Sequence, residues 1–192
     1  MLSYTELKPG ACVVLDNQPY LVMESEFLRM QQRKPVMKTK LKNLITGRTA
    51  DRSFQSSDEI KEAELEKIKS RFIYENKGEC WFHETDNPKN RFSLKSEKVG
   101  KPAGFLKSEL EITAIKFGDI IINVELPIKA EYKIVEAPPA IRGDTAQGGA
   151  KTVVLETGAK ISAPLFINEG DIIKVNTQTG EYVERVKKTE KI

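Results

Sequence analysis

The sequence predicts an all-β protein made of three small β-barrel domains in series. Runs of apolar or β-branched residues recur along the chain, each bounded by Gly, Pro, Asn or Asp, which is typical of short strands and tight turns. Only residues 58–71, DEIKEAELEKIKSR, favour helix by composition, and they could equally form a charged connection between domains. The runs fall into three groups, which predict domains at residues 1–64, 65–127 and 128–192.

The first group predicts two hairpin arms. The runs ACVVL and PYLVMESEF flank the turn residues Asp16 and Asn17. Residues 36–45 then alternate, so a strand there would carry three lysines on one face. The lysines are Lys38, Lys40 and Lys42, and the opposite face would carry Met37, Thr39 and Leu41.

The second and third groups also consist of hairpins. Turns are expected around Asn76-Lys77-Gly78 and Gly118-Asp119, and residues 93–107 are expected to hold one short helix, broken near Gly100 and Pro102. Strands, hairpins and one small helix are typical of an oligonucleotide-binding (OB) barrel. Four further runs beyond Pro127, around the loop PPAIRGDTAQGGAK, predict a third barrel of the same kind.

Composition excludes several classes of protein. With 39% hydrophobic and 31% charged residues, the chain is expected to fold and to be soluble. No window approaches the roughly 18 to 20 apolar residues of a membrane span, and the first residues lack the pattern of a secretion signal. We therefore expect a cytoplasmic protein without a membrane partner. Cys12 and Cys80 lie far apart, and both are expected to be reduced and buried.

No residue pattern predicts an enzyme. The single histidine, His83, has no cysteine or second histidine at ligand spacing, so it is expected to be a surface or packing residue. Neither a GxGxxG fingerprint nor a GxxxxGK phosphate loop occurs. We expect no catalytic residue, no metal and no cofactor.

Positive charge is concentrated in residues 27–48, FLRMQQRKPVMKTKLKNLITGR. This segment holds seven Lys and Arg and no acidic residue, so subtracting its +7 from the +3 of the whole chain leaves the rest at −4. Such an array suits RNA phosphates, and the predicted backbone contacts are Arg29, Lys38, Lys40 and Lys42. The alternative is a lysine-rich edge strand that only discourages aggregation.

The C-terminal residues carry a family resemblance. Residues 143–186, GDTAQGGAKTVVLETGAKISAPLFINEGDIIKVNTQTGEYVERV, closely resemble the C-terminal domain of bacterial elongation factor P. The N-terminal stretches LKPGACVVLDNQPYLVMESEF and KLKNLITGR resemble the same family, and the middle domain does so more weakly. Val153 and Ala163 depart from the usual residues. Matching signature positions are Lys151, Gly158, Ile161, Pro164, Ile167 and Gly170.

The resemblance implies a KOW/SH3-like N-terminal barrel followed by two OB-fold barrels, with a tRNA-like overall shape. It implies a monomeric translation factor that binds both subunits of the ribosome between the P and E sites. There it would contact ribosomal RNA and the P-site peptidyl-tRNA, whose CCA end it positions to stimulate peptide-bond formation at consecutive prolines. Tyr182 and Arg185 would contact RNA at the far end.

The predicted loop tip departs from the family. Relatives read like SEFVKPGKG, with a modified lysine or an arginine at the tip, whereas the tip position here falls on Gln32. Residues 31–34 are the expected contacts at the peptidyl-transferase centre, and either Gln32 or Arg33 could occupy the tip. Lys34 precedes a proline and is a less favoured modification site. The four residues are Gln31, Gln32, Arg33 and Lys34.

A second hypothesis is a general RNA-binding protein built from OB-fold barrels, without a role in peptidyl transfer. It predicts salt-sensitive binding to many single-stranded RNAs. The chain contains only one Trp and five Tyr for base stacking, which favours the first hypothesis.

Overall fold

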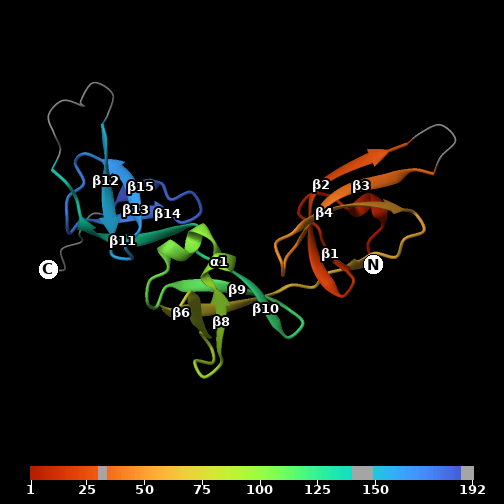
Figure 1. Cartoon of the computed structure of the whole chain (residues 1–192), viewed down its shortest axis with the longest axis horizontal. Coiled ribbons are helices and arrows are strands. Elements are labelled where there is room, and N and C mark those ends of the chain that lie inside the picture. Colours follow the sequence, from red (N-terminus) through yellow and green to blue (C-terminus); the bar gives the residue numbers. More distant parts are fainter. Residues whose placement is uncertain (30–33, 140–148, 187–192) are drawn as a thin grey trace. The chain divides into compact units, whose positions relative to one another are not determined.

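A computed structural model describes residues 1–29, 34–139 and 149–186 (Figure 1). Its strands form three five-stranded sheets, and its helices are single short turns. The predicted all-β class is therefore confirmed. The predicted loop residues 31–33 and most of the Gly-rich loop after Pro139 lie outside the described residues.

The first sheet has the strand order β4-β3-β2-β1-β5. Its inner face buries a core that includes Leu7, Val13, Val22, Leu41 and Phe54. The elements are the 3₁₀ helix η1 (Tyr4–Glu6), β1 (Cys12–Leu15), β2 (Gln18–Leu28), β3 (Val36–Asn43), β4 (Thr49–Gln55) and β5 (Lys61–Glu62).

The second sheet has the order β10-β9-β6-β7-β8. A short helix and a 3₁₀ turn follow β8, and they meet at Gly100, whose φ of 74° suits glycine; this is the broken helix that the sequence predicts. The elements are β6 (Glu66–Asn76), β7 (Glu79–Glu84), β8 (Arg91–Lys95), α1 (Ser96–Val99), η2 (Lys101–Phe105), β9 (Glu111–Phe117) and β10 (Ile120–Glu125).

The third sheet has the order β13-β12-β11-β14-β15. Counted from its own first strand, this is the order 3-2-1-4-5, and the second sheet has the same order, as two OB barrels should. Ala130, Tyr132 and Ile134 alternate into the core from β11. The strands are β11 (Lys129–Glu136), β12 (Ala150–Leu155), β13 (Lys160–Pro164), β14 (Ile172–Asn176) and β15 (Tyr182–Arg185).

The predicted hairpin turns are confirmed by their backbone angles. Asp16 and Asn17, between β1 and β2, have φ of 50° and 59°, and Lys77 and Gly78, between β6 and β7, have φ of 50° and 78°. Two successive residues with positive φ match the twist of a two-residue hairpin.

Residues 58–71 do not form the helix that their composition favours. Lys61 and Glu62 form β5, which pairs with Val14 and Val13 of β1, and β6 begins at Glu66. Period-two burial, with Ser70 and Phe72 inside and their neighbours outside, overrides the helical propensity of Glu, Lys and Leu. The alternative of a charged connection also fails for the residues within the two strands.

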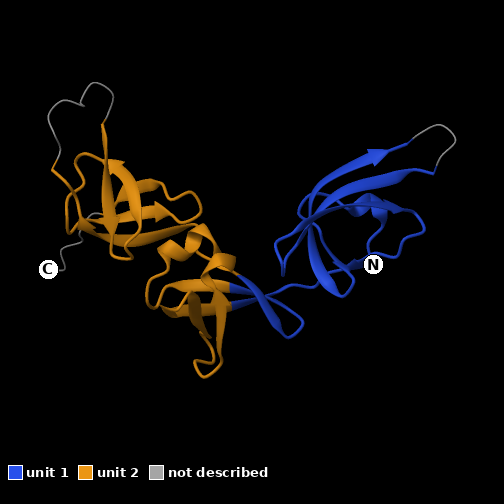
Figure 2. Ribbon diagram, in the orientation of Figure 1, with its two compact units in different colours: residues 1–68, 114–123 blue, residues 69–113, 124–192 orange. Residues whose placement is uncertain are grey.

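Contacts between Cα atoms group the chain into two compact units (Figure 2). Residues 1–68 and 114–123 form one unit, and residues 69–113 and 124–192 form the other. Since this division differs from the three sheets, the domain boundaries after residues 64 and 127 stay a prediction.

Candidate nucleic-acid interface

The β2–β3 hairpin carries the predicted basic residues. Met37, Thr39 and Leu41 are buried on one face of β3, so the predicted alternation is confirmed. The opposite face exposes Lys38, Lys40 and Lys42.

The edge-strand alternative for these lysines is wrong, because β3 lies between β2 and β4 in the sheet. The hydroxyl of the buried Thr39 donates a 2.9 Å hydrogen bond to the carbonyl oxygen of Arg52 on β4, which adds a side-chain tie to the strand ladder. The lysines are therefore presented on a firmly paired central strand.

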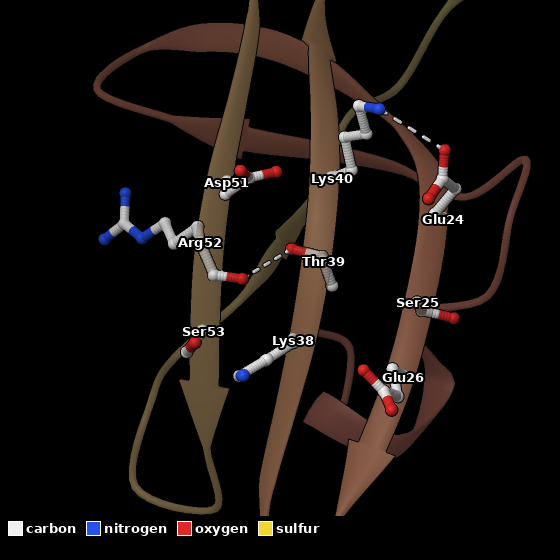
Figure 3. Close-up of a pocket in the computed structure, with 9 residues that line it drawn as sticks. All are labelled: Glu24, Ser25, Glu26, Lys38, Thr39, Lys40, Asp51, Arg52 and Ser53. Carbon is white, nitrogen blue, oxygen red and sulfur yellow. Dashed lines mark hydrogen bonds and ion pairs between the residues drawn. The ribbon is translucent and has the colours of Figure 1, made fainter.

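Carboxylates from the neighbouring strands stand opposite two of the three lysines (Figure 3). Glu24 and Asp51 flank Lys40, and Glu26 is opposite Lys38. The Nζ atom of Lys40 lies 3.5 Å from a carboxylate oxygen of Glu24. A shallow hollow of about 540 Å³ is lined by these three carboxylates and by three cations, so its charges balance; the cations are Lys38, Lys40 and Arg52.

Lys42 differs from the other two lysines. Its partners across the sheet are Leu21 on β2 and Thr49 on β4, neither of which is charged. The sequence did not reveal this difference, because the register depends on a bulge at Met23, between Val22 and Glu24.

The end of the hairpin keeps an uncompensated positive charge. Arg29 and Lys34 are both exposed, and no acidic residue occurs between Glu26 and Asp51. The predicted tip residues Gln31, Gln32 and Arg33 lie outside the described part of the chain. Along the hairpin the charge therefore changes from balanced around Lys38 and Lys40 to positive at the end.

The far-end residues Tyr182 and Arg185 lie on the same face of β15. They stand opposite Val175 and Ile173 of β14, and the register shift at Val183 lets residues three apart share a face. The structure thus brings together the two residues that the family resemblance singled out.

Phe166 is a neighbour that the sequence analysis missed. The Arg185 guanidinium carbon lies 5.8 Å from the centre of the Phe166 ring, and a terminal nitrogen of Arg185 lies 3.6 Å from a carboxylate oxygen of Asp171. Phe166 is 58% exposed, which is unusual for a large aromatic residue. In the sequence, Phe166 follows Pro164 and Leu165 in the run PLFIN, and nothing distinguished it from these apolar neighbours.

Two family models match the chain. The model described as "Elongation factor P (EF-P) KOW-like domain" matches residues 3–60, and "Elongation factor P, C-terminal" matches residues 130–185. Elongation factor P of Thermodesulfovibrio yellowstonii is 33% identical over 97% of this chain and 100% of its own length. The chain belongs to the elongation factor P family.

Other relatives agree over nearly the same span. Elongation factor P of Moorella thermoacetica is 35% identical, and that of Thermotoga petrophila is 37% identical, each over 96% of this chain and 100% of the relative. A solved structure, eukaryotic translation initiation factor 5A from Methanococcus jannaschii, covers 66% of this chain and 90% of its own, with a TM-score of 0.53. At 9% identity, that likeness concerns the fold alone.

As a member of the elongation factor P family, the protein is a translation elongation factor rather than a conventional enzyme. His83 is half-buried, and its Nδ1 atom lies 2.9 Å from the carbonyl oxygen of Glu84. Within residues 1–29, 34–139 and 149–186, no three His, Cys, Asp or Glu side chains gather into a possible metal site. In the same ranges no helix is long and apolar enough to cross a membrane.

The two cysteines are free thiols. Cys80 is buried as predicted, whereas Cys12 is only half-buried. Burial raises the pKa of both thiols, and Glu62 beside Cys12 and Glu75 beside Cys80 raise it further. Both are therefore protonated and weakly nucleophilic at neutral pH.

Proposed function

We propose that this elongation factor binds the ribosome between the P and E sites and stimulates peptide-bond formation at consecutive prolines. In this proposal a cytoplasmic monomer contacts both ribosomal subunits and ribosomal RNA. It steadies the CCA end of the P-site peptidyl-tRNA through the end of the β2–β3 hairpin. Membership of the elongation factor P family supports the proposal.

Consecutive prolines pose a problem of positioning. The ring fixes φ and leaves a secondary amine as the nucleophile, so both the peptide path and the attacking group are constrained. Holding two reactants in a productive geometry is itself a large rate effect and requires no catalytic side chain in the factor. A rigid arm that touches the peptidyl-tRNA is sufficient for this role.

The change of charge along the hairpin is the observation that carries the proposal. On the strands, Glu24, Glu26 and Asp51 offset the charge of Lys38 and Lys40, so this part of the face attracts a phosphate backbone weakly. At the end, Arg29 and Lys34 have no carboxylate opposite them among the paired strand positions. We therefore assign the main RNA contacts to the hairpin end and to Lys42, with Lys38 and Lys40 as weaker contacts.

The proposal is tested by synthesis of a triple-proline peptide in a reconstituted translation system with saturating recombinant factor. We expect clear acceleration over reactions without factor, and no acceleration for a peptide without prolines. Acceleration should fall in the double variant Arg29→Gln, Lys34→Gln, while the matched variant Lys40→Gln should retain it. Failure of the wild-type factor to accelerate the triple-proline peptide would contradict the proposal.

The residue at the tip is identified in the same assay. A loss of acceleration in Gln32→Ala but not in Arg33→Ala assigns the contact to the glutamine amide, and the reverse result assigns it to the arginine. Peptide mass mapping of residues 29–38 from cells determines whether Lys34 is modified.

A further inference from the structure

An exposed aromatic pair lies on the second sheet, away from the residues assigned to the proposed function. Trp81 of β7 stands opposite Tyr74 of β6, with ring centroids 6.3 Å apart and planes 26° apart, which is a stacked arrangement. Tyr74 is 46% exposed and Trp81 is half-buried. Trp81 is the only tryptophan of the chain.

Strand alternation places this pair on the outer face of the barrel. Cys80 and Phe82, on either side of Trp81, are buried, so Trp81 and His83 point outward. Their partners on β8 are Ser93 and Arg91, which share the outer face. The strands β6, β7 and β8 therefore present the aromatic pair on a continuous surface.

Cations flank the aromatic pair on β8. Arg91 pairs with His83 on one side of the Trp81 row, and Lys95 pairs with Glu79 on the other. Both cations are exposed, and neither forms an ion pair with any described residue. Glu79 opposite Lys95 offsets part of its charge, as Glu26 does for Lys38, so Arg91 is the less compensated of the two. Arg71, on the neighbouring strand β6, is held by Glu109 at 3.3 Å and Glu111 at 2.8 Å, so it is less available to a ligand.

We propose that the outer face of β6, β7 and β8 binds single-stranded RNA. One unpaired base stacks on the Tyr74–Trp81 pair, and the adjoining phosphates contact Arg91 and, more weakly, Lys95. Aromatic rings accept any base through its π-face, and nearby cations follow the backbone. In OB folds the face formed by the second and third strands, here β7 and β8, binds oligonucleotides.

A protein partner is less suited to this face. Protein interfaces are centred on a larger apolar core and are depleted in charged residues there. Here two rings lie between an arginine and a lysine, and the adjoining outward residue on β8 is Ser93. A ligand that combines flat apolar faces with negative charge fits this arrangement, and an RNA single strand is such a ligand.

The pair could instead act only within the sheet. Cross-strand aromatic pairs stabilise hairpins by a fraction of a kilocalorie per mole up to about 1 kcal/mol. A purely structural role would make the rings important for unfolding and irrelevant to RNA. The two roles therefore differ in a measurable way.

The test uses the fluorescence of Trp81 in the full chain, titrated with a single-stranded uridine decamer at low salt. We expect saturable quenching, because a stacked base changes the surroundings of the indole. Tyr74→Leu should weaken binding about fivefold or more, and Arg91→Gln with Lys95→Gln should weaken it and reduce its salt dependence. Lys160→Gln, at an exposed lysine of the third sheet outside both proposed RNA sites, should leave the quenching unchanged.

Three outcomes would overturn the inference. One is constant Trp81 fluorescence over the whole titration. A second is undiminished RNA binding by a Tyr74→Leu protein whose unfolding midpoint matches the wild type. If a labelled decamer binds but only Lys42→Gln weakens it, the RNA site lies on the hairpin and the inference is also wrong. Since no step uses ribosomes, the result is independent of the triple-proline assay.

Discussion

The role of each lysine on β3 depends on the residue opposite it. Lys40 has Glu24 on one side and Asp51 on the other, whereas Lys42 has only uncharged partners. The Lys40–Glu24 pair is exposed on both sides, and such pairs contribute about 0 to 1 kcal/mol to folding. The charge of Lys40 is thus partly offset within the sheet, although the ion pair contributes little to stability.

This difference predicts unequal effects of two matched substitutions. Lys42→Gln should weaken ribosome binding and reduce the slope of log K against log salt by about 0.7 to 0.9. Lys40→Gln should change both quantities less, because Glu24 and Asp51 already offset its charge. Filter binding or light scattering at several salt concentrations measures the slopes. Equal slopes for the two variants would show that the cross-strand carboxylates do not matter.

Phe166 should support Arg185 in the third sheet. The ring lies under the guanidinium, and an exposed cation–π contact is worth about 0.5 to 1 kcal/mol, or about a two- to fivefold effect. We expect Phe166→Leu to lower the triple-proline rate by this factor at subsaturating factor, and Phe166→Tyr to retain it. A fully active Phe166→Leu protein, beside an impaired Arg185→Gln protein, would show that Arg185 acts without the ring.

The sequence identified residues whose position depends on a local pattern, and it missed residues that are brought close by other strands. The faces of β3 were predictable because alternation is local, and Arg185 was found through the family resemblance. The carboxylates beside Lys40 and the ring beside Arg185 come from other strands or loops. Their positions depend on bulges and on sheet order, which no local pattern reveals.

At the scale of elements, one turn occurs twice. Residues 43–47, NLITG, and residues 176–180, NTQTG, connect strand pairs in the first and third sheets. In each turn the Asn side-chain oxygen accepts two backbone N–H groups, and the Gly N–H donates to the Asn carbonyl oxygen. Gly47 and Gly180 have φ of 75° and 77°, which favours glycine.

Of the two asparagines, Asn43 is expected to contribute more to stability. It is buried, and its side-chain amide also donates a 2.6 Å hydrogen bond to Gln18. Asn43→Ala leaves the N–H groups of Ile45 and Thr46 without their acceptor, which should lower the unfolding free energy by about 1 to 3 kcal/mol. Asn43→Asp keeps the acceptor and should cost less. Urea unfolding measures both, and equal losses would contradict this account of the turn.

Residues 58–71 illustrate the limit of local propensity, because they favour helix by composition but contain two strands. Glu, Lys and Leu favour helix in isolation, but Lys61 and Glu62 gain a partner strand in β1. The longer β6 buries Ser70 and Phe72 in alternation, a pattern that the many charged residues of this segment partly conceal. Pairing with other strands therefore determines the secondary structure of this segment. In the sequence, only the apolar residues after Arg71 indicate a strand.

At the scale of the molecule, a buried cluster joins η2 to the third sheet within one compact unit. The hydroxyl of Tyr132, which is 0% exposed, donates a 2.8 Å hydrogen bond to the carbonyl oxygen of Phe105. Lys107 donates to the carbonyl oxygen of Glu131 at 2.7 Å and to Glu156 at 3.0 Å, and its Nζ atom lies 5.3 Å from the centre of the Tyr132 ring. These contacts connect η2 and the loop after it to β11 and to the turn after β12.

The same cluster predicts how stability depends on alkaline pH. Burial, with a further contribution from Glu156, raises the pKa of Tyr132 well above its ordinary value. The folded state therefore keeps its phenol proton where the unfolded chain loses it. This stabilisation is complete below about pH 10 and declines as pH rises above that value, by about 1.4 kcal/mol per pH unit for one proton.

Urea unfolding between pH 8 and 11 should show this decline in the wild-type protein. Tyr132→Phe should start lower by about 1 kcal/mol, because it lacks the hydrogen bond to Phe105. Its stability should then fall less steeply above pH 10, because the phenol is absent, so the two curves converge at high pH. Parallel curves would show that Tyr132 does not link the fold to pH, and would place the alkaline sensitivity on other groups.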